Sequence, residues 1–268
     1  MTQSESMKYE VLDHPEISNS IFHPRQEWGG FSNQTSDKDH LIPVAPAVHV
    51  GARFHTTATQ AATILFFHGN GEIASDYDDL GPLYNQLGIN FVVADYRGYG
   101  RSSGRPTVSA MMADAHVIFD YLNQWRSQNQ FTGPLLVMGR SLGSASALEL
   151  ASARPNEIAG LIIESGFALA EPLLRLLGVD VRRIGFREEL CFRNVDKIMK
   201  YSGPTLIIHA QHDHIIPFTD GRMLYEACGA TQKKLLQIDG ANHNDIFMRG
   251  LEPYLQAVKD LIQAIPRK

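Results

Sequence analysis

The stretch LLVMGRSLGSASALELA, residues 135 to 151, decides the fold. It begins with a short apolar run typical of a strand buried on both faces, and it continues into small and apolar residues that favour a helix. Between the two lies the pattern GxSxG, with Gly139 and Gly143 on either side of Ser141. A serine on a sharp turn between strand and helix is strained, so only small residues fit at the two glycine positions. We therefore expect Ser141 to project into a cleft at the carboxyl end of a strand.

The rest of the chain alternates between similar apolar runs and segments with helical spacing. The runs are ATILFFH (62 to 68), FVVAD (91 to 95), PLLVMG (134 to 139), IAGLIIE (158 to 164), TLIIHA (205 to 210) and KLLQI (234 to 238). A helical set is Met111, Ala115, Ile118, Leu122 and Trp125, whose steps of three and four share one face. Such alternation predicts a mainly parallel sheet with helices on both sides and its chemistry at the carboxyl strand ends. Residues 41 to 54 predict an additional strand or hairpin at a sheet edge.

Composition narrows the class of protein. With 268 residues, 44% of them hydrophobic, the chain can bury one full core, and we expect a single domain over residues 1 to 268. A net charge of -5 gives no attraction to nucleic acid or anionic lipid. Cys191 and Cys228 stand far apart and outside any metal-binding spacing, which indicates reduced thiols. The polar start and the lack of a long apolar run predict a cytoplasmic protein without membrane insertion.

The serine turn resembles the nucleophile elbow of the α/β-hydrolase superfamily. The resemblance implies a mostly parallel central sheet of about eight strands flanked by helices, with a small lid or none. It also implies a nucleophile, an acid and a histidine in that chain order. Asp213, in TLIIHAQHDHIIPF, follows a late strand and precedes an apolar pair and a proline, as the acid does in this superfamily. Its rival is Glu164 in IIESGF, at the end of the preceding strand.

The base and the oxyanion donors follow from the same resemblance. His243, in LLQIDGANHNDIF, lies in the loop after the last strand, roughly 30 residues beyond Asp213. The HG pair in ATILFFHGNGE points to the backbone amide of Asn70 as one donor. The amide of Leu142, at the start of the helix, is the other. For His68 we expect a structural role, shaping the loop, rather than that of a base.

Two further stretches allow more than one interpretation. Asp95 and Arg97 in ADYRGYGRSSG are either a substrate clamp or an ion pair that fixes the loop, and we favour the ion pair. Residues 168 to 204 contain several leucines, which predict either a small helical lid or the buried face of a crossover helix. The leucines are Leu169, Leu173, Leu174, Leu176 and Leu177. Arginines crowd the same stretch, and we favour a solvated, partly salt-bridged face over an anionic substrate site. These arginines are Arg175, Arg182, Arg183, Arg187 and Arg193.

The nearest branch of the superfamily is the group with little or no cap, which includes carboxylesterases, serine aminopeptidase-like proteins and protein depalmitoylases. Depalmitoylases of this group carry an N-terminal cysteine cluster, and this sequence has none. The resemblance thus implies hydrolysis of a small-molecule carboxylic ester of short or medium acyl chain through an acyl-enzyme, with no metal or organic cofactor. Thioesters and peptide bonds remain alternatives, and so does a non-catalytic binding protein on the same fold. Residues 1 to 60 match the superfamily poorly, and we expect edge strands there. The sequence does not decide the oligomeric state.

Overall fold

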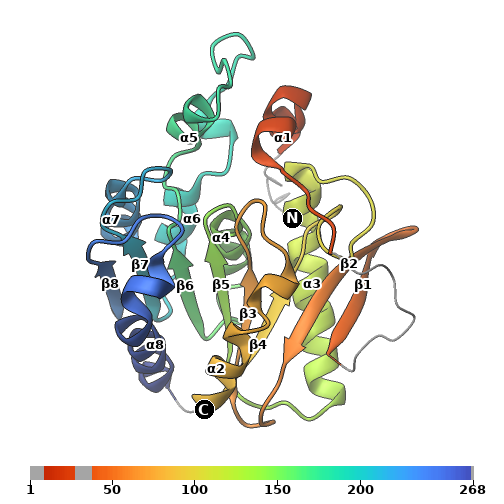
Figure 1. The fold of residues 1–268 in the computed structure, drawn as a ribbon, viewed down its shortest axis with the longest axis vertical. Helices are drawn as coiled ribbons and strands as arrows, with labels where there is room; N and C mark the ends of the chain where they lie inside the picture. The colour runs from red at the N-terminus through yellow and green to blue at the C-terminus, as the bar shows by residue number, and fades with distance from the viewer. Residues whose placement is uncertain (1–8, 28–37, 267–268) are drawn as a thin grey trace, which may run out of the picture.

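The structure is a computed structural model that describes residues 9 to 27 and 38 to 266. One eight-stranded sheet runs through it in the order β1-β2-β4-β3-β5-β6-β7-β8 (Figure 1). The strands are β1 (Asp39–Ala45), β2 (Val48–His55), β3 (Ala62–Phe67), β4 (Ile89–Ala94), β5 (Leu135–Arg140), β6 (Gly160–Glu164), β7 (Thr205–Ala210) and β8 (Lys233–Ile238). Strands β3 to β8 pair in parallel, while β1 and β2 form an antiparallel hairpin at one edge. The predicted α/β sheet of about eight strands is confirmed.

Helices cover both faces of this sheet. They are α1 (Pro15–Ile21), α2 (Leu80–Gln86), α3 (Val108–Gln128), α4 (Gly143–Ala153), α5 (Ala170–Leu176), α6 (Asn194–Lys200), α7 (Phe218–Ala227) and α8 (Ile246–Ala264). Side chains alternate along each strand, so β3 sends Leu65 into one buried cluster, with α3, α4, α6 and α7, and Phe66 into the other, with α2 and α8. Short 3-10 turns occur at η1 (Tyr9–Asp13), η2 (Ala74–Tyr77) and η3 (Glu188–Leu190).

The N-terminal region differs from the expectation of edge strands. Residues 39 to 55 do form the edge hairpin, but residues 9 to 13 and 15 to 21 are helical. Residues 1 to 8 and 28 to 37, which the same expectation covered, lie outside the described residues. Pro15 occupies the first turn of α1, and the side chain of His14 accepts a hydrogen bond from the N–H of Glu16. Ile17 and Ile21, four residues apart, are both buried. These features span only one or two helical turns. They do not predict a helix from the sequence alone, because no longer apolar pattern accompanies them.

Candidate active site

Ser141 lies on the turn between β5 and α4, where its φ of 51° is in the left-handed region. A Cβ on Gly139 would be 2.2 Å from the carbonyl oxygen of Gly143, and one on Gly143 would be 2.0 Å from that of Phe67. Because these contacts are with backbone atoms, no side chain could move aside to relieve them. Both glycines of the motif are therefore required for the turn that presents Ser141.

The structure brings Ser141, His243 and Asp213 together from the ends of β5, β8 and β7. His243 Nε2 lies 3.1 Å from Ser141 Oγ, and His243 Nδ1 lies 2.7 Å from Asp213 Oδ2. The other carboxylate oxygen, Oδ1, accepts the N–H groups of Ile215 and Ile216 at 3.0 and 2.8 Å. Burial alone would raise the pKa of Asp213, but these hydrogen bonds and the nearby imidazole hold it below its ordinary value. The carboxylate is thus kept ionised and aimed at the imidazole.

Glu164, the rival acid, is engaged elsewhere. Its carboxylate accepts Arg140 Nε at 3.0 Å and the hydroxyl of Tyr254 at 2.6 Å, and its side chain is fully buried. Burial raises the pKa of Glu164, and the adjacent Arg140 opposes that shift without reversing it. The imidazole therefore pairs with Asp213 rather than with Glu164.

The two amides expected to bind an oxyanion lie beside the serine. Asn70 and Leu142 line the same cavity as Ser141. Within the described part of the chain, no hydrogen-bond acceptor is recorded for either backbone N–H. The side-chain oxygen of Asn70 accepts the N–H of His23 at 2.9 Å and the hydroxyl of Tyr99 at 2.7 Å, which fixes the loop. Both amides are thus free to receive a ligand oxygen.

His68, Asp95 and Arg97 form hydrogen bonds with other groups of the protein. His68 is fully buried, and its ring nitrogens face the carbonyl of Gly69 at 2.8 Å and Asp95 at 3.2 Å. The expected ion pair between Asp95 and Arg97 is wrong. Arg97 instead forms two hydrogen bonds of 2.7 Å with Asp114 on α3. Both residues follow the end of β4, where the chain leaves the sheet and turns. Asp95 therefore faces the loop after β3, where it accepts the N–H of Ala74, while Arg97 faces α3.

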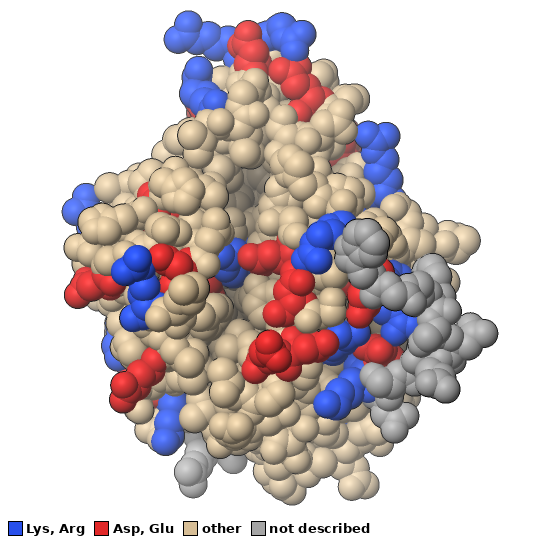
Figure 2. Space-filling view, viewed as in Figure 1, with Lys and Arg blue, Asp and Glu red and all other residues tan. Residues whose placement is uncertain are grey.

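A cavity of about 270 Å³ opens at Ser141. Its walls are mostly apolar, and the apolar residues come from α1, α5 and the adjoining loops. The polar lining residues are Asn70, Glu72, Arg140, Ser141, His243 and Asn244. The apolar residues are Ile21, Leu142, Phe167, Ala170, Leu173, Leu174, Leu177, Phe192 and Ile215. Figure 2 shows the surface hollowed between the parts that carry α5 and α1, with mostly uncharged residues around the hollow. A larger cavity, about 980 Å³, lies at the opposite end of the strands and contains none of the candidate residues.

The segment of residues 168 to 204 contains two α-helices, and the five leucines named above lie in or beside the first, α5. α5 stands over the carboxyl ends of the strands and lines the cavity, while α6, which contains none of these leucines, packs on α4. That α5 acts as a lid stays a prediction. None of the five arginines lines this cavity, and three of them form ion pairs with acidic neighbours. The pairs are Arg175 with Glu171, Arg183 with Glu16 and Arg193 with Asp196.

The described residues contain no group of three or more His, Cys, Asp or Glu side chains placed to hold a metal ion. No helix among residues 9 to 27 and 38 to 266 is both long and apolar enough to cross a membrane. Cys191 and Cys228 are buried, unpaired thiols.

Sequence reasoning missed three residues around the site, namely Arg140, Glu72 and Ile21. Arg140 is 7% exposed and Glu72 pairs with it at the edge of the cavity. A signal for Arg140 was present, since an arginine at the end of a buried strand needs acidic partners and Glu164 ends the next strand. Ile21 reaches the cavity from α1, and nothing in the sequence indicates that contact.

Comparison with known proteins concerns the family and the fold of the chain. The family model "Serine aminopeptidase, S33" matches residues 58 to 184. Human "Alpha/beta hydrolase domain-containing protein 17B" is 33% identical over an alignment of 210 residues, which covers 75% of this chain and 66% of that protein. Protein 17C of Xenopus tropicalis is 34% identical over 208 residues, 75% and 61% of the two chains. The chain thus spans roughly three fifths of the length of the curated relatives it matches.

Among solved structures, Est1E from Butyrivibrio proteoclasticus with bound ferulic acid superposes with a TM-score of 0.69 at 20% identity. The match covers 84% of this chain and 98% of that one. At this identity the likeness concerns the fold alone. The strand order, the strand-to-helix turn and the sequence relatives point the same way, and the chain belongs to the α/β-hydrolase superfamily.

Proposed function

We propose that the chain is a serine hydrolase that cleaves carboxylic esters with an apolar acyl group of short or medium length. One observation carries the proposal. The Oγ of Ser141, hydrogen-bonded to His243, opens onto a cavity whose wall is mostly apolar. A volume of about 270 Å³ is at the small end for ligand cavities, which favours short or medium chains over long ones.

Each residue then has one role in an acyl-enzyme mechanism. His243 Nε2 takes the hydroxyl proton as Ser141 Oγ attacks the carbonyl carbon, and Asp213 stabilises the imidazolium. The amides of Asn70 and Leu142 bind the oxyanion, and each contributes about 3 to 4 kcal/mol of barrier lowering. The imidazolium returns its proton to the leaving alcohol, after which water, activated by His243, releases the acid and regenerates Ser141.

The cavity favours an acyl ester over an aminopeptidase substrate. A free substrate ammonium group would need an ionised carboxylate with unused hydrogen-bonding capacity. Glu72 is the one cavity-lining carboxylate among the described residues, and it is occupied by Arg140, the N–H of Gly69 and the hydroxyl of Tyr77. An acyl thioester fits the same apolar wall and is the second candidate.

The decisive experiment combines labelling with turnover. The wild type should react with a fluorophosphonate probe and hydrolyse p-nitrophenyl esters, with kcat/KM highest for short or medium chains. Ser141→Ala should abolish both. Ser146→Ala is the matched control, because Ser146 is a fully buried serine on α4 whose hydroxyl has no partner in the described structure. Turnover that survives Ser141→Ala would refute the proposal.

A panel of acyl thioesters and aminoacyl amides separates the alternatives. Higher kcat/KM for thioesters than for matched esters would favour the thioesterase. Ligand binding without labelling or turnover would indicate the non-catalytic binding protein.

A further inference from the structure

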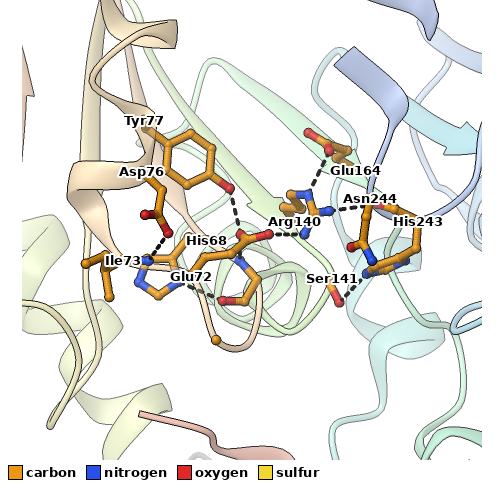
Figure 3. A network of polar contacts seen from close by, with 12 residues as sticks. His68, Glu72, Ile73, Asp76, Tyr77, Arg140, Ser141, Glu164, His243 and Asn244 are labelled. Atoms are coloured by element: carbon orange, nitrogen blue, oxygen red, sulfur yellow. Dashed lines mark hydrogen bonds and ion pairs between the residues drawn. The ribbon is translucent and has the colours of Figure 1, made fainter. Parts of the chain in front are cut away.

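Arg140, the residue before Ser141, joins three separate elements beneath the site (Figure 3). Its Nε donates to Glu164 at the end of β6 at 3.0 Å, and its Nη2 donates to the backbone carbonyl of His243 at 2.7 Å. Its Nη1 pairs with Glu72 in the loop after β3. The side chain is nearly inaccessible to water, so solvent cannot replace these bonds.

The bond to His243 holds the loop that carries the proposed base, residues 239 to 245, which we call the base loop. His243 lies in the loop between β8 and α8, and its carbonyl oxygen is bound by the guanidinium while its ring faces Ser141. The ring nitrogen must stay within hydrogen-bond reach of Oγ to accept the proton. Because Arg140 and Ser141 are consecutive residues, this bond ties the base loop directly to the nucleophile turn.

The ion pair with Glu72 holds the loop after β3, residues 68 to 73, which we call the oxyanion loop because it contains Asn70. Glu72 Oε2 accepts the N–H of Gly69 at 2.6 Å and the hydroxyl of Tyr77 at 2.6 Å. Gly69 precedes Asn70, whose amide is the proposed oxyanion donor. Burial would raise the pKa of Glu72, but the guanidinium of Arg140 holds it below its ordinary value. Arg140 therefore acts on the position of the donor through an ionised carboxylate.

We propose that Arg140 is a positioning residue that holds the base loop and the oxyanion loop in register with Ser141, an inference that rests on the proposed function. Arginine suits this task because its planar guanidinium carries five N–H donors in fixed directions. A lysine keeps the charge but has three donors on one atom, and it cannot reach three elements at once.

The test compares Arg140→Lys and Glu72→Gln with Arg97→Lys as the matched control. Arg97 forms a two-bond ion pair with Asp114 but contacts none of the proposed catalytic groups. Arg140→Lys should lower kcat for p-nitrophenyl butyrate about 100-fold with KM within about twofold, since misplacement by an ångström has effects of this size. Glu72→Gln weakens one of the three contacts of Arg140 and leaves its bond to the His243 carbonyl in place, so it should lower kcat about tenfold. Arg97→Lys should leave kcat unchanged.

A second readout separates positioning from general stability. A trifluoromethyl ketone forms a tetrahedral adduct with the serine. In each variant its inhibition constant should rise by the same factor by which kcat/KM falls. Thermal unfolding measurements test whether each variant is folded at the assay temperature. A folded Arg140→Lys with kcat and inhibition constant within about threefold of wild type would overturn the positioning role. If Arg140→Lys does not fold, unchanged values for Glu72→Gln overturn it. A wild type that neither labels nor turns over esters overturns the proposed function instead.

Discussion

The substitution Asp213→Asn tests the site most sharply, because the surroundings dictate how the asparagine must sit. In the wild type, Oδ1 accepts two backbone N–H groups, from Ile215 and Ile216, while Oδ2 faces His243 Nδ1. The asparagine oxygen must take the place of Oδ1, since its NH2 group cannot accept from those two donors. The NH2 group then faces His243 Nδ1.

The consequence is a change of tautomer. A donor opposite Nδ1 forces that nitrogen to be the acceptor, which leaves the proton on Nε2. Nε2 can then no longer accept the proton of Ser141, although the atoms have hardly moved. A tautomer error of this kind costs about 10⁴-fold in kcat, or about 5.5 kcal/mol at about 1.4 kcal/mol per factor of ten. Stability should change little, because both backbone hydrogen bonds are kept.

The assay measures kcat for p-nitrophenyl butyrate and the rate of fluorophosphonate labelling, with urea unfolding as the check on folding. Asp220→Asn is the matched control, because Asp220 is another carboxylate that accepts a backbone N–H, from Ala168 at 2.8 Å, and in the described structure it forms no hydrogen bond with His243. A folded Asp213→Asn that keeps more than about a tenth of wild-type kcat would refute the assignment of the acid.

Three other outcomes are expected. Ile21→Ala, which shortens the wall of the cavity, should raise kcat/KM for longer p-nitrophenyl esters about tenfold relative to the butyrate; an unchanged chain-length profile would remove Ile21 from the acyl site. Gly143→Ala places a Cβ 2.0 Å from the Phe67 carbonyl oxygen, so the urea-derived free energy of unfolding should fall by about 3 kcal/mol, and a loss below about 1 kcal/mol would contradict the steric argument. Burial would raise the pKa of Glu149, but its hydrogen bonds and a neighbouring positive charge lower it to about 2. A depressed carboxyl pKa stabilises the fold above the ordinary value of 4.5 and ceases to do so as pH falls toward 2. The free energy of unfolding of Glu149→Gln should therefore be about 3 kcal/mol below that of wild type above pH 5 and almost equal to it near pH 2. A difference that does not depend on pH would show that the pKa of Glu149 is not lowered.

Much of the fold was readable from local pattern. The buried strands were found because parallel strands covered on both faces must be apolar throughout, and that demand is written in consecutive residues. The turn at Ser141 was found for a related reason, since Gly139 and Gly143 meet a steric requirement inside five residues. The candidate Asp213 and His243 needed the superfamily's chain order in addition, because neither has a local signal that sets it apart from other polar loop residues.

Contacts between distant segments were decided only by the tertiary structure. Arg97 pairs with Asp114 rather than Asp95, and Glu164 turns to Arg140 rather than to the imidazole, because the partner of a buried charge depends on which strands and helices meet. The contact of the N-terminal helix α1 with the cavity likewise depends on which elements meet in the fold. The sequence alone thus determined the sheet and the strand-to-helix turn at Ser141, where each requirement is local. The pairing of charges and the walls of the cavity arise from residues tens to hundreds of positions apart, and only the folded chain brings them together.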